Sequence, residues 1–100
     1  MKLPREQVQE IDRPELTETF ADALGNGSFD GQTARLAFCV TRLDPIEPPK
    51  PPTAKRYPVC RLVLPPDAVI ELFNQLQQLI GLMEKQGLVK RENGQPRTIN

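Results

Sequence analysis

The residues of this chain whose types allow covalent chemistry are its two cysteines, Cys39 and Cys60. An arginine close to a thiol, as Arg35 or Arg61 would be to Cys39, lowers the pKa of the thiol and makes it a better nucleophile. The chain has no histidine, however, so it lacks a Cys–His or Ser–His pair and an imidazole metal ligand. Two isolated cysteines also lack the paired CxxC spacing of zinc sites. We therefore predict packing cysteines and no metal or cofactor.

Two acidic residues, Asp22 and Asp30, flank the glycine-rich stretch Gly25-Asn26-Gly27-Ser28. The glycines are too few for a phosphate-binding loop, and a strand pattern rather than a helix follows them. Glycine accepts positive φ, so the stretch predicts a turn or a bulge. Acids in such positions are typically solvated. An enzyme built on Cys39 or on this acidic pair is the last of three hypotheses, and we predict a non-enzymatic protein without catalytic residues.

The charges balance, with thirteen Lys and Arg against thirteen Asp and Glu in 100 residues. No global field therefore steers the chain to nucleic acid or to an anionic membrane. A local basic patch remains, formed by Lys50, Lys55, Arg56 and Arg61 with Tyr57 available for stacking. Nucleic-acid binding through residues 50–61 is the alternative function.

The chain shows no signal for a membrane. Its amino-terminal residues contain no apolar run like that of a signal peptide, and no apolar run approaches the roughly 18 residues that span a bilayer. We expect a cytoplasmic protein.

Alternating apolar residues predict two strands, Thr33 to Leu43 and Val59 to Leu64. Pairing their apolar faces puts Ala34, Leu36, Phe38 and Val40 on the same side as Cys60, Leu62 and Leu64. Cys39 then points to the opposite side from Cys60. A one-residue slip that brought the cysteines together would mix apolar and charged faces. The pattern thus predicts two reduced cysteines.

A proline-rich segment from Asp44 to Pro58 separates these strands and holds six of the eleven prolines. Proline cannot donate to a sheet ladder, so we expect an extended connection there. Two interpretations stay open. The segment is either a stiff connection between strands or a recognition element, because Pro45, Pro48 and Pro51 have the PxxP spacing of peptide ligands.

A strongly amphipathic helix is predicted from Pro66 to Gln86. Pro66 suits the first helical turn, Asp67 suits the positive end of the helix dipole, and Gly87 is a plausible residue just past the end. Three- and four-residue spacing gathers seven apolar residues into one stripe: Val69, Leu72, Phe73, Leu76, Leu79, Ile80 and Met83. This stripe must be buried, and we predict it to be the surface for self-association or for a partner. Gly81 inside the helix hints at the close approach of another backbone.

The chain resembles a small, uncharacterised bacterial family, a domain of unknown function. The resemblance rests on Phe20-Ala21-Asp22, on Arg35-Leu36-Ala37-Phe38, and on Arg61-Leu62-Val63-Leu64-Pro65-Pro66 before a leucine-rich helix. Pro65 stands where the family has a capping serine, and Met83 where it has an aromatic residue. The resemblance implies a strand-rich half followed by one long helix, and it implies no activity or site residues.

We predict one α+β domain over residues 17–87, between flexible tails at 1–16 and 88–100. An antiparallel sheet of three or four strands would be covered by the helix packed across it. Little core remains once the tails and the proline-rich segment are set aside, so help from a second subunit is expected. The leading hypothesis is a non-enzymatic homo-oligomeric interaction module, with a dimer favoured and a peptide-binding or chaperone-like role for its helix and sheet-edge surfaces.

Overall fold

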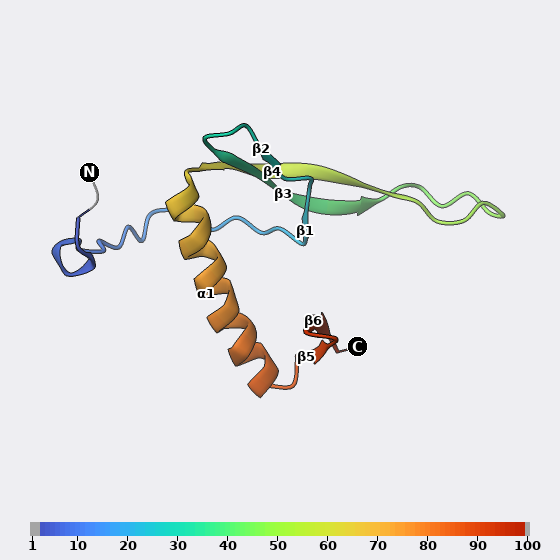
Figure 1. The fold of residues 1–100 in the computed structure, drawn as a ribbon. Helices are drawn as coiled ribbons and strands as arrows, with labels where there is room; N and C mark the ends of the chain where they lie inside the picture. The colour runs from blue at the N-terminus through green and yellow to red at the C-terminus, as the bar shows by residue number, and fades with distance from the viewer. Residues whose placement is uncertain (1–2, 100) are drawn as a thin grey trace.

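The computed structural model describes residues 3–99 and has α+β composition, as predicted (Figure 1). A short 3-10 turn, η1, spans Arg5–Gln7, and one long helix follows the main sheet. The elements after η1 are β1 (Ala23–Leu24), β2 (Ser28–Phe29), β3 (Ala34–Leu43), β4 (Ala54–Leu64), α1 (Pro66–Lys85), β5 (Val89–Glu92) and β6 (Gln95–Thr98).

The main sheet is antiparallel and is built around β3, which pairs with β4 along one edge and with β1 and β2 along the other. Its register sets Leu36 opposite Leu62 and Phe38 opposite Cys60. Cross-strand partners share a face. The predicted apolar face is therefore confirmed, and Cys39 lies on the opposite face, as predicted.

The glycine-rich stretch forms a bulge between β1 and β2. Leu24 pairs with Phe38 and Ser28 pairs with Arg35, so three residues of this edge stand against two of β3. A Cβ at Gly25 would lie 3.3 Å from the Cβ of Ala37, which explains why a residue without a side chain is suited to this position. The sequence from Thr17 to Leu24 fits a strand pattern only loosely, and the structure forms a strand only at its last two residues, as β1.

Strand β4 begins five residues earlier than predicted, at Ala54. Pro58 is accommodated within β4 because the register shifts between Phe38 and Cys39, and because β4 is an edge strand. The proline-rich connection therefore covers only residues 44–53. It is not one continuous extended run either, since the amide of Lys50 donates to the carbonyl of Glu47 and closes a turn.

Helix α1 has the predicted start and ends one residue before the predicted end. Pro66 occupies the first turn after the extended Pro65. At the other end, the amide of Leu88 donates to the carbonyl of Met83, and the amide of Gly87, at φ +79°, donates to that of Glu84. This pair of bonds is a Schellman motif, in which glycine takes the left-handed position. The prediction for Gly87 is confirmed.

The helix does not lie across the sheet, which corrects our expectation of two packed layers. In Figure 1, α1 leaves the end of β4 and runs away from the strands. Among the described elements, its main contacts are with β4, where the chain enters the helix, and with β5. The amphipathic pattern showed that one side must be buried, but such a pattern contains no information on which chain buries it.

The segment after α1 was expected to be a tail, and it instead contains the hairpin β5–β6. Asn93 and Gly94 have φ values of +52° and +80°, the signs of a two-residue type I′ turn. The hairpin is attached to the helix through Arg91, whose Nε lies 2.9 Å from Oε1 of Glu84. Val89 is buried, and it and Cys39 are the only two buried residues among residues 3–99.

Candidate interaction site

Two apolar surfaces lie open in the single chain. The first is the α1 stripe, which consists of Val69, Leu72, Phe73, Leu76, Leu79, Ile80 and Met83. Phe73 is 56% exposed, Leu79 48% and Leu76 45%. Amphipathic helices normally cover such residues, so the stripe lacks the contact that its sequence requires.

The second surface is the face of the main sheet that carries Phe38, which we call the inner sheet face. The register places ten residues on it: Leu24, Phe29, Ala34, Leu36, Phe38, Val40, Tyr57, Cys60, Leu62 and Leu64. All are partly or fully exposed, Leu62 at 38% and Phe29 at 64%. Sequence alternation had indicated seven of them. Leu24, Phe29 and Tyr57 were missed because their strand segments were not resolved from the pattern.

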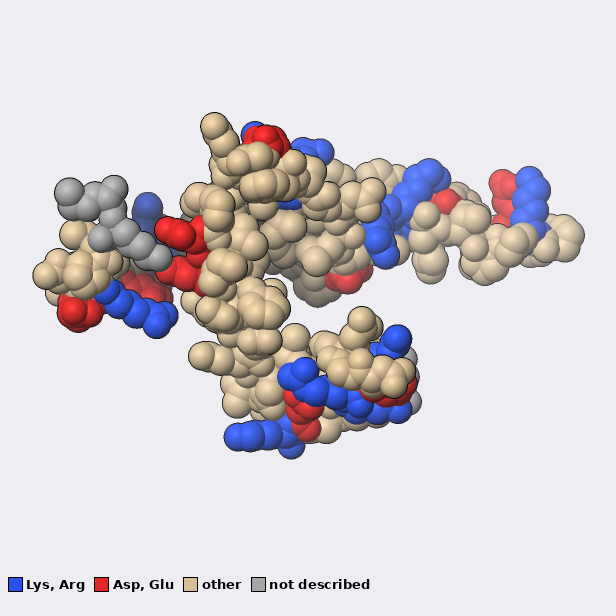
Figure 2. Space-filling view, in the orientation of Figure 1, with Lys and Arg blue, Asp and Glu red and all other residues tan. Residues whose placement is uncertain are grey.

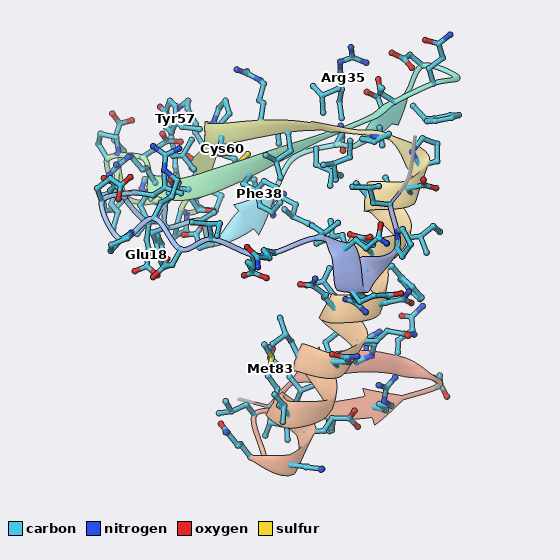
Figure 3. All side chains as sticks on the ribbon, turned by 90° about the vertical axis from the view of Figure 1, so that its left-hand side faces the viewer. Glu18, Arg35, Phe38, Tyr57, Cys60 and Met83 are labelled. Carbon is cyan, nitrogen blue, oxygen red and sulfur yellow. The ribbon has the colours of Figure 1, made fainter. Side chains whose placement is uncertain are left out.

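The two surfaces meet at an open angle. In Figure 3, Phe38 lies on the side of the sheet from which α1 descends, whereas Arg35 points to the other side. Met83 projects from α1 into the space under the sheet. Figure 2 shows mainly uncharged atoms over α1 and the adjoining part of the sheet, while Lys and Arg side chains lie on the terminal hairpin, along the far part of β3 and β4, at the top of the sheet and beside the amino-terminal residues. The two apolar surfaces thus border the same corner of the molecule.

The chain exposes much more surface than a compact monomer of its mass. The chain exposes 9377 Å², whereas a folded monomer of 11.3 kDa exposes about 5,700 Å². Its radius of gyration is 17.9 Å, against about 13 Å for a compact domain of this length. Part of this excess belongs to the extended amino-terminal residues and the proline-rich connection. The remainder reflects a helix that does not pack on its sheet.

The connection between β4 and α1 explains this separation. Pro65 is the only residue between Leu64 and Pro66, and it holds φ −70° and ψ 165°. Its own ring restricts φ, and the following Pro66 disfavours the helical region for it. The hinge therefore holds an extended conformation, and with one residue α1 cannot turn back over the sheet.

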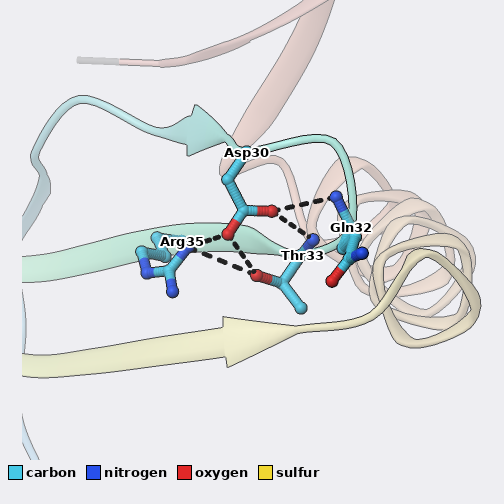
Figure 4. A network of polar contacts seen from close by, with 4 residues as sticks. All are labelled: Asp30, Gln32, Thr33 and Arg35. Carbon is cyan, nitrogen blue, oxygen red and sulfur yellow. Dashed lines mark hydrogen bonds and ion pairs between the residues drawn. The ribbon is translucent and has the colours of Figure 1, made fainter.

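The acidic residues near the bulge have structural roles. Asp30 accepts hydrogen bonds from the amides of Gln32 and Thr33 at 2.9 and 2.8 Å, and Nη1 of Arg35 lies 2.6 Å from its Oδ2 (Figure 4). The Thr33 amide, the Arg35 guanidinium and the Gln32 amide together hold the pKa of this carboxyl far below its ordinary value. This network closes the turn between β2 and β3.

Asp22 lies far from Asp30. Its Oδ1 accepts from the amide and the hydroxyl of Thr41, at 2.9 and 3.1 Å. Thr41 and Thr33 are eight residues apart on or next to β3, which is about 26 Å. The two acids therefore cannot act on one substrate atom. Within residues 3–99, no group of three or more His, Cys, Asp or Glu residues is placed to hold a metal ion.

Both cysteines are free thiols, as predicted. Cys39 is buried at 4% exposure, and Cys60 is half-buried on the inner sheet face. Arg35 and Arg61 share the face of Cys39, but neither is bonded to its sulfur in the described structure. The geometry thus supports packing roles for both side chains.

The four residues of the predicted basic patch do not converge. Lys55 makes an ion pair with Asp44 at 2.5 Å, and Lys50 lies 3.7 Å from Glu47. Arg56 donates to the carbonyl of Leu24. Lys55 shares the face of Arg42, whereas Arg56 and Arg61 share the opposite face with Thr41 and Ala37. Pairing and alternation thus split the patch, and the nucleic-acid alternative gains no support from this arrangement.

One further hollow lies between the amino-terminal residues and the polar side of α1. It has a volume of about 1190 Å³, is wide open, and is lined by Leu3, Arg5, Val8, Glu10, Glu71, Asn74, Gln75, Gln77 and Gln78. Within the described part of the chain, the lining contains two carboxylates and four side-chain amides but no Cys, Ser, Thr or Lys side chain that could act as a nucleophile.

Comparisons with known protein families, with curated proteins and with solved structures give no match. The family resemblance of the sequence therefore stays a prediction. No helix in the described part of the chain is both long and apolar enough to cross a bilayer.

Proposed function

We propose that this protein is a homo-oligomeric interaction module that performs no catalysis, in which the α1 stripe and the inner sheet face are the contact surfaces. The observation that carries this proposal is the exposure of both surfaces in one chain. Burial of apolar area contributes about 25 cal/mol per Å². A chain of this size that left the α1 stripe and the inner sheet face exposed to water would lose most of the hydrophobic stabilisation available to it. Assembly with further copies restores it.

The area is of the right size for a stable assembly. Obligate homodimers commonly bury about 2,000 to 5,000 Å² in total, which is about 1,000 to 2,500 Å² from each chain. Each chain here exposes roughly 3,600 Å² more than a compact monomer, so an interface of this size accounts for a large part of the excess, and the extended segments account for the rest. The formal net charge of zero also means that copies do not repel each other globally.

The proposed contacts form through the α1 stripe and the inner sheet face, and not through the edges of the sheet. Within residues 3–99 the outer edge of β4 is unpaired, but Lys55, Arg56 and Pro58 lie on this strand, and such residues discourage the addition of another strand. A peptide-binding or chaperone-like role at the edges stays a prediction. We also propose a cytoplasmic location, in keeping with two free thiols.

The test is the mass in solution of two matched variants, measured by light scattering after size exclusion. Leu76→Glu places a charge in the centre of the α1 stripe, and Gln78→Glu places the same charge on the opposite side of the helix. We expect Leu76→Glu to move the chain to its single-chain mass, and Gln78→Glu to keep the mass of the natural protein.

Circular dichroism of both variants distinguishes loss of assembly from loss of the helix. The milder Leu76→Ala should retain the fold and raise the concentration needed for assembly. Equal masses for all variants would refute the proposed role of the stripe, and a natural chain that runs at 11.3 kDa at every concentration would refute the proposal as a whole.

A further inference from the structure

We propose that two copies of this chain exchange their helices, so that the α1 stripe of each copy lies on the inner sheet face of the other. This inference rests on the proposed function and specifies its geometry. It commits to a second copy as the occupant of the apolar corner, because the same chain supplies both halves of the missing contact.

The short connection between β4 and α1 blocks closure within one chain. The hinge between β4 and α1 is Pro65 alone, and α1 begins immediately with Pro66. Short connections that cannot fold back favour exchange of identical elements between copies, since the helix then packs on the sheet of the other copy instead of its own. The inner sheet face and the α1 stripe therefore stay apart in each copy.

The α1 stripe and the inner sheet face match in length. From Val69 to Met83 the stripe runs about 21 Å along the helix axis. The apolar part of the inner sheet face runs from Ala34 to Val40, about 20 Å along β3. Beyond Val40 the same face carries Arg42 and Lys55, so the apolar area ends where the stripe would end.

The shape of the molecule also suits exchange between two copies. The sheet and α1 enclose an open angle whose inner sides carry Phe38 and Met83 (Figure 3). Two such angles related by a twofold axis can each receive the helix of the other. Both contacts then form at once, which is the reciprocal arrangement that twofold symmetry demands.

The experiment is disulfide trapping between two distinguishable full-length chains. One carries Cys39→Ala, Cys60→Ala and Leu76→Cys together with a size tag. The other carries only Cys39→Ala and keeps Cys60, at the centre of the inner sheet face. The chains are unfolded together, refolded as a mixture and oxidised, and the products are separated on a non-reducing gel.

Exchange predicts that the main cross-linked product contains one chain of each kind. In the matched control the tagged chain carries Gln78→Cys, on the opposite side of α1, in place of Leu76→Cys. This product should then not form. Ile80→Cys, a second stripe position, should give it again if Leu76→Cys disturbs folding.

Three outcomes would overturn exchange. Cross-links only between two chains that both carry Leu76→Cys would show that stripes face each other. A third chain, which carries Cys39→Ala and Leu76→Cys and keeps Cys60, tests closure in cis, and a bond between its own two thiols would show such closure. Contact between stripes leaves the proposed homo-oligomer standing and removes only the exchange, whereas closure in cis or a single-chain mass for the unmodified protein removes the proposed function and the exchange together.

Discussion

Phe38 on β3 lies directly opposite Cys60 on β4, and both face the inner side of the sheet. The neighbouring Cys39 pairs with Pro58 and is buried on the other side. The sheet itself thus separates the two thiols, and it places only Cys60 on the surface that we assign to a second copy.

The first prediction concerns the oxidation and labelling of the two thiols. Mild oxidation of the folded protein should leave both thiols free, because strands in this register cannot bring Cys39 and Cys60 into disulfide geometry. In addition, dilution should speed the reaction of Cys60 with a thiol reagent, since dissociation uncovers it. Mass spectrometry of labelled peptides reads both effects, and a peptide pair linked through Cys39 and Cys60 would contradict the register.

The second prediction concerns the stability of the fold at acidic pH. The folded state holds the pKa of Asp30 below its ordinary value of 3.8, through the Thr33 amide, the Arg35 guanidinium and the Gln32 amide. A lowered pKa means that the ionised carboxylate stabilises the turn at neutral pH, and that this contribution is lost as the pH falls below about 4. Asp30→Asn should reduce stability at pH 7 and flatten the pH dependence below 4.

Denaturant unfolding between pH 7 and the acidic range below pH 4 measures the free energy of unfolding of the natural protein and of Asp30→Asn. The two stabilities should converge at low pH. A constant difference between the two proteins at every pH would show that the charge of Asp30 contributes nothing.

The third prediction uses two glycines of the helical region as a matched pair. Gly87 has φ +79°, so Gly87→Ala should destabilise the protein by about 1 kcal/mol. Gly81 lies inside α1 with nothing within 4 Å of the position of a Cβ, so Gly81→Ala should stabilise by about 1 kcal/mol.

Thermal melting measures both changes. Loss of stability in Gly81→Ala, accompanied by weaker assembly, would instead indicate that the second copy approaches the helix at this position. Such a result would move the contact away from the stripe.

The fourth prediction tests the hinge. Insertion of a flexible Gly-Ser linker of about four residues between Pro65 and Pro66 should let α1 close over its own sheet. We expect sedimentation velocity to show a shift to a compact single chain. The same insertion between Pro51 and Pro52, in the proline-rich connection, is the control and should leave the assembly unchanged. An unaltered assembly in both variants would contradict the role given to the hinge.

Alternation and capping residues predicted the faces of the central strands and the ends of the helix, but not every strand and not the placement of the helix. The positions of Phe38 and Cys60 followed from period-two alternation, and the ends of α1 followed from Pro66 and Gly87. The start of β4 was missed because Pro58 was interpreted as the end of a connection, whereas an edge strand with a bulge accommodates it.

The terminal hairpin was also missed, although Asn93-Gly94 is a strong signal for a two-residue turn. Its short strands carry little apolar periodicity, with Val89 as the one buried residue. The sequence pattern does not determine where α1 packs. Leu76 must be covered, and neither spacing nor propensity tells whether its own sheet or that of another copy does so.

Sedimentation equilibrium of the natural protein over a wide range of concentrations tests the central claim most directly. Our account predicts a mass of twice 11.3 kDa that falls toward the single-chain value only on strong dilution. A mass of 11.3 kDa throughout, with α1 still helical by circular dichroism, would contradict it, because the apolar stripe would then be stable without cover.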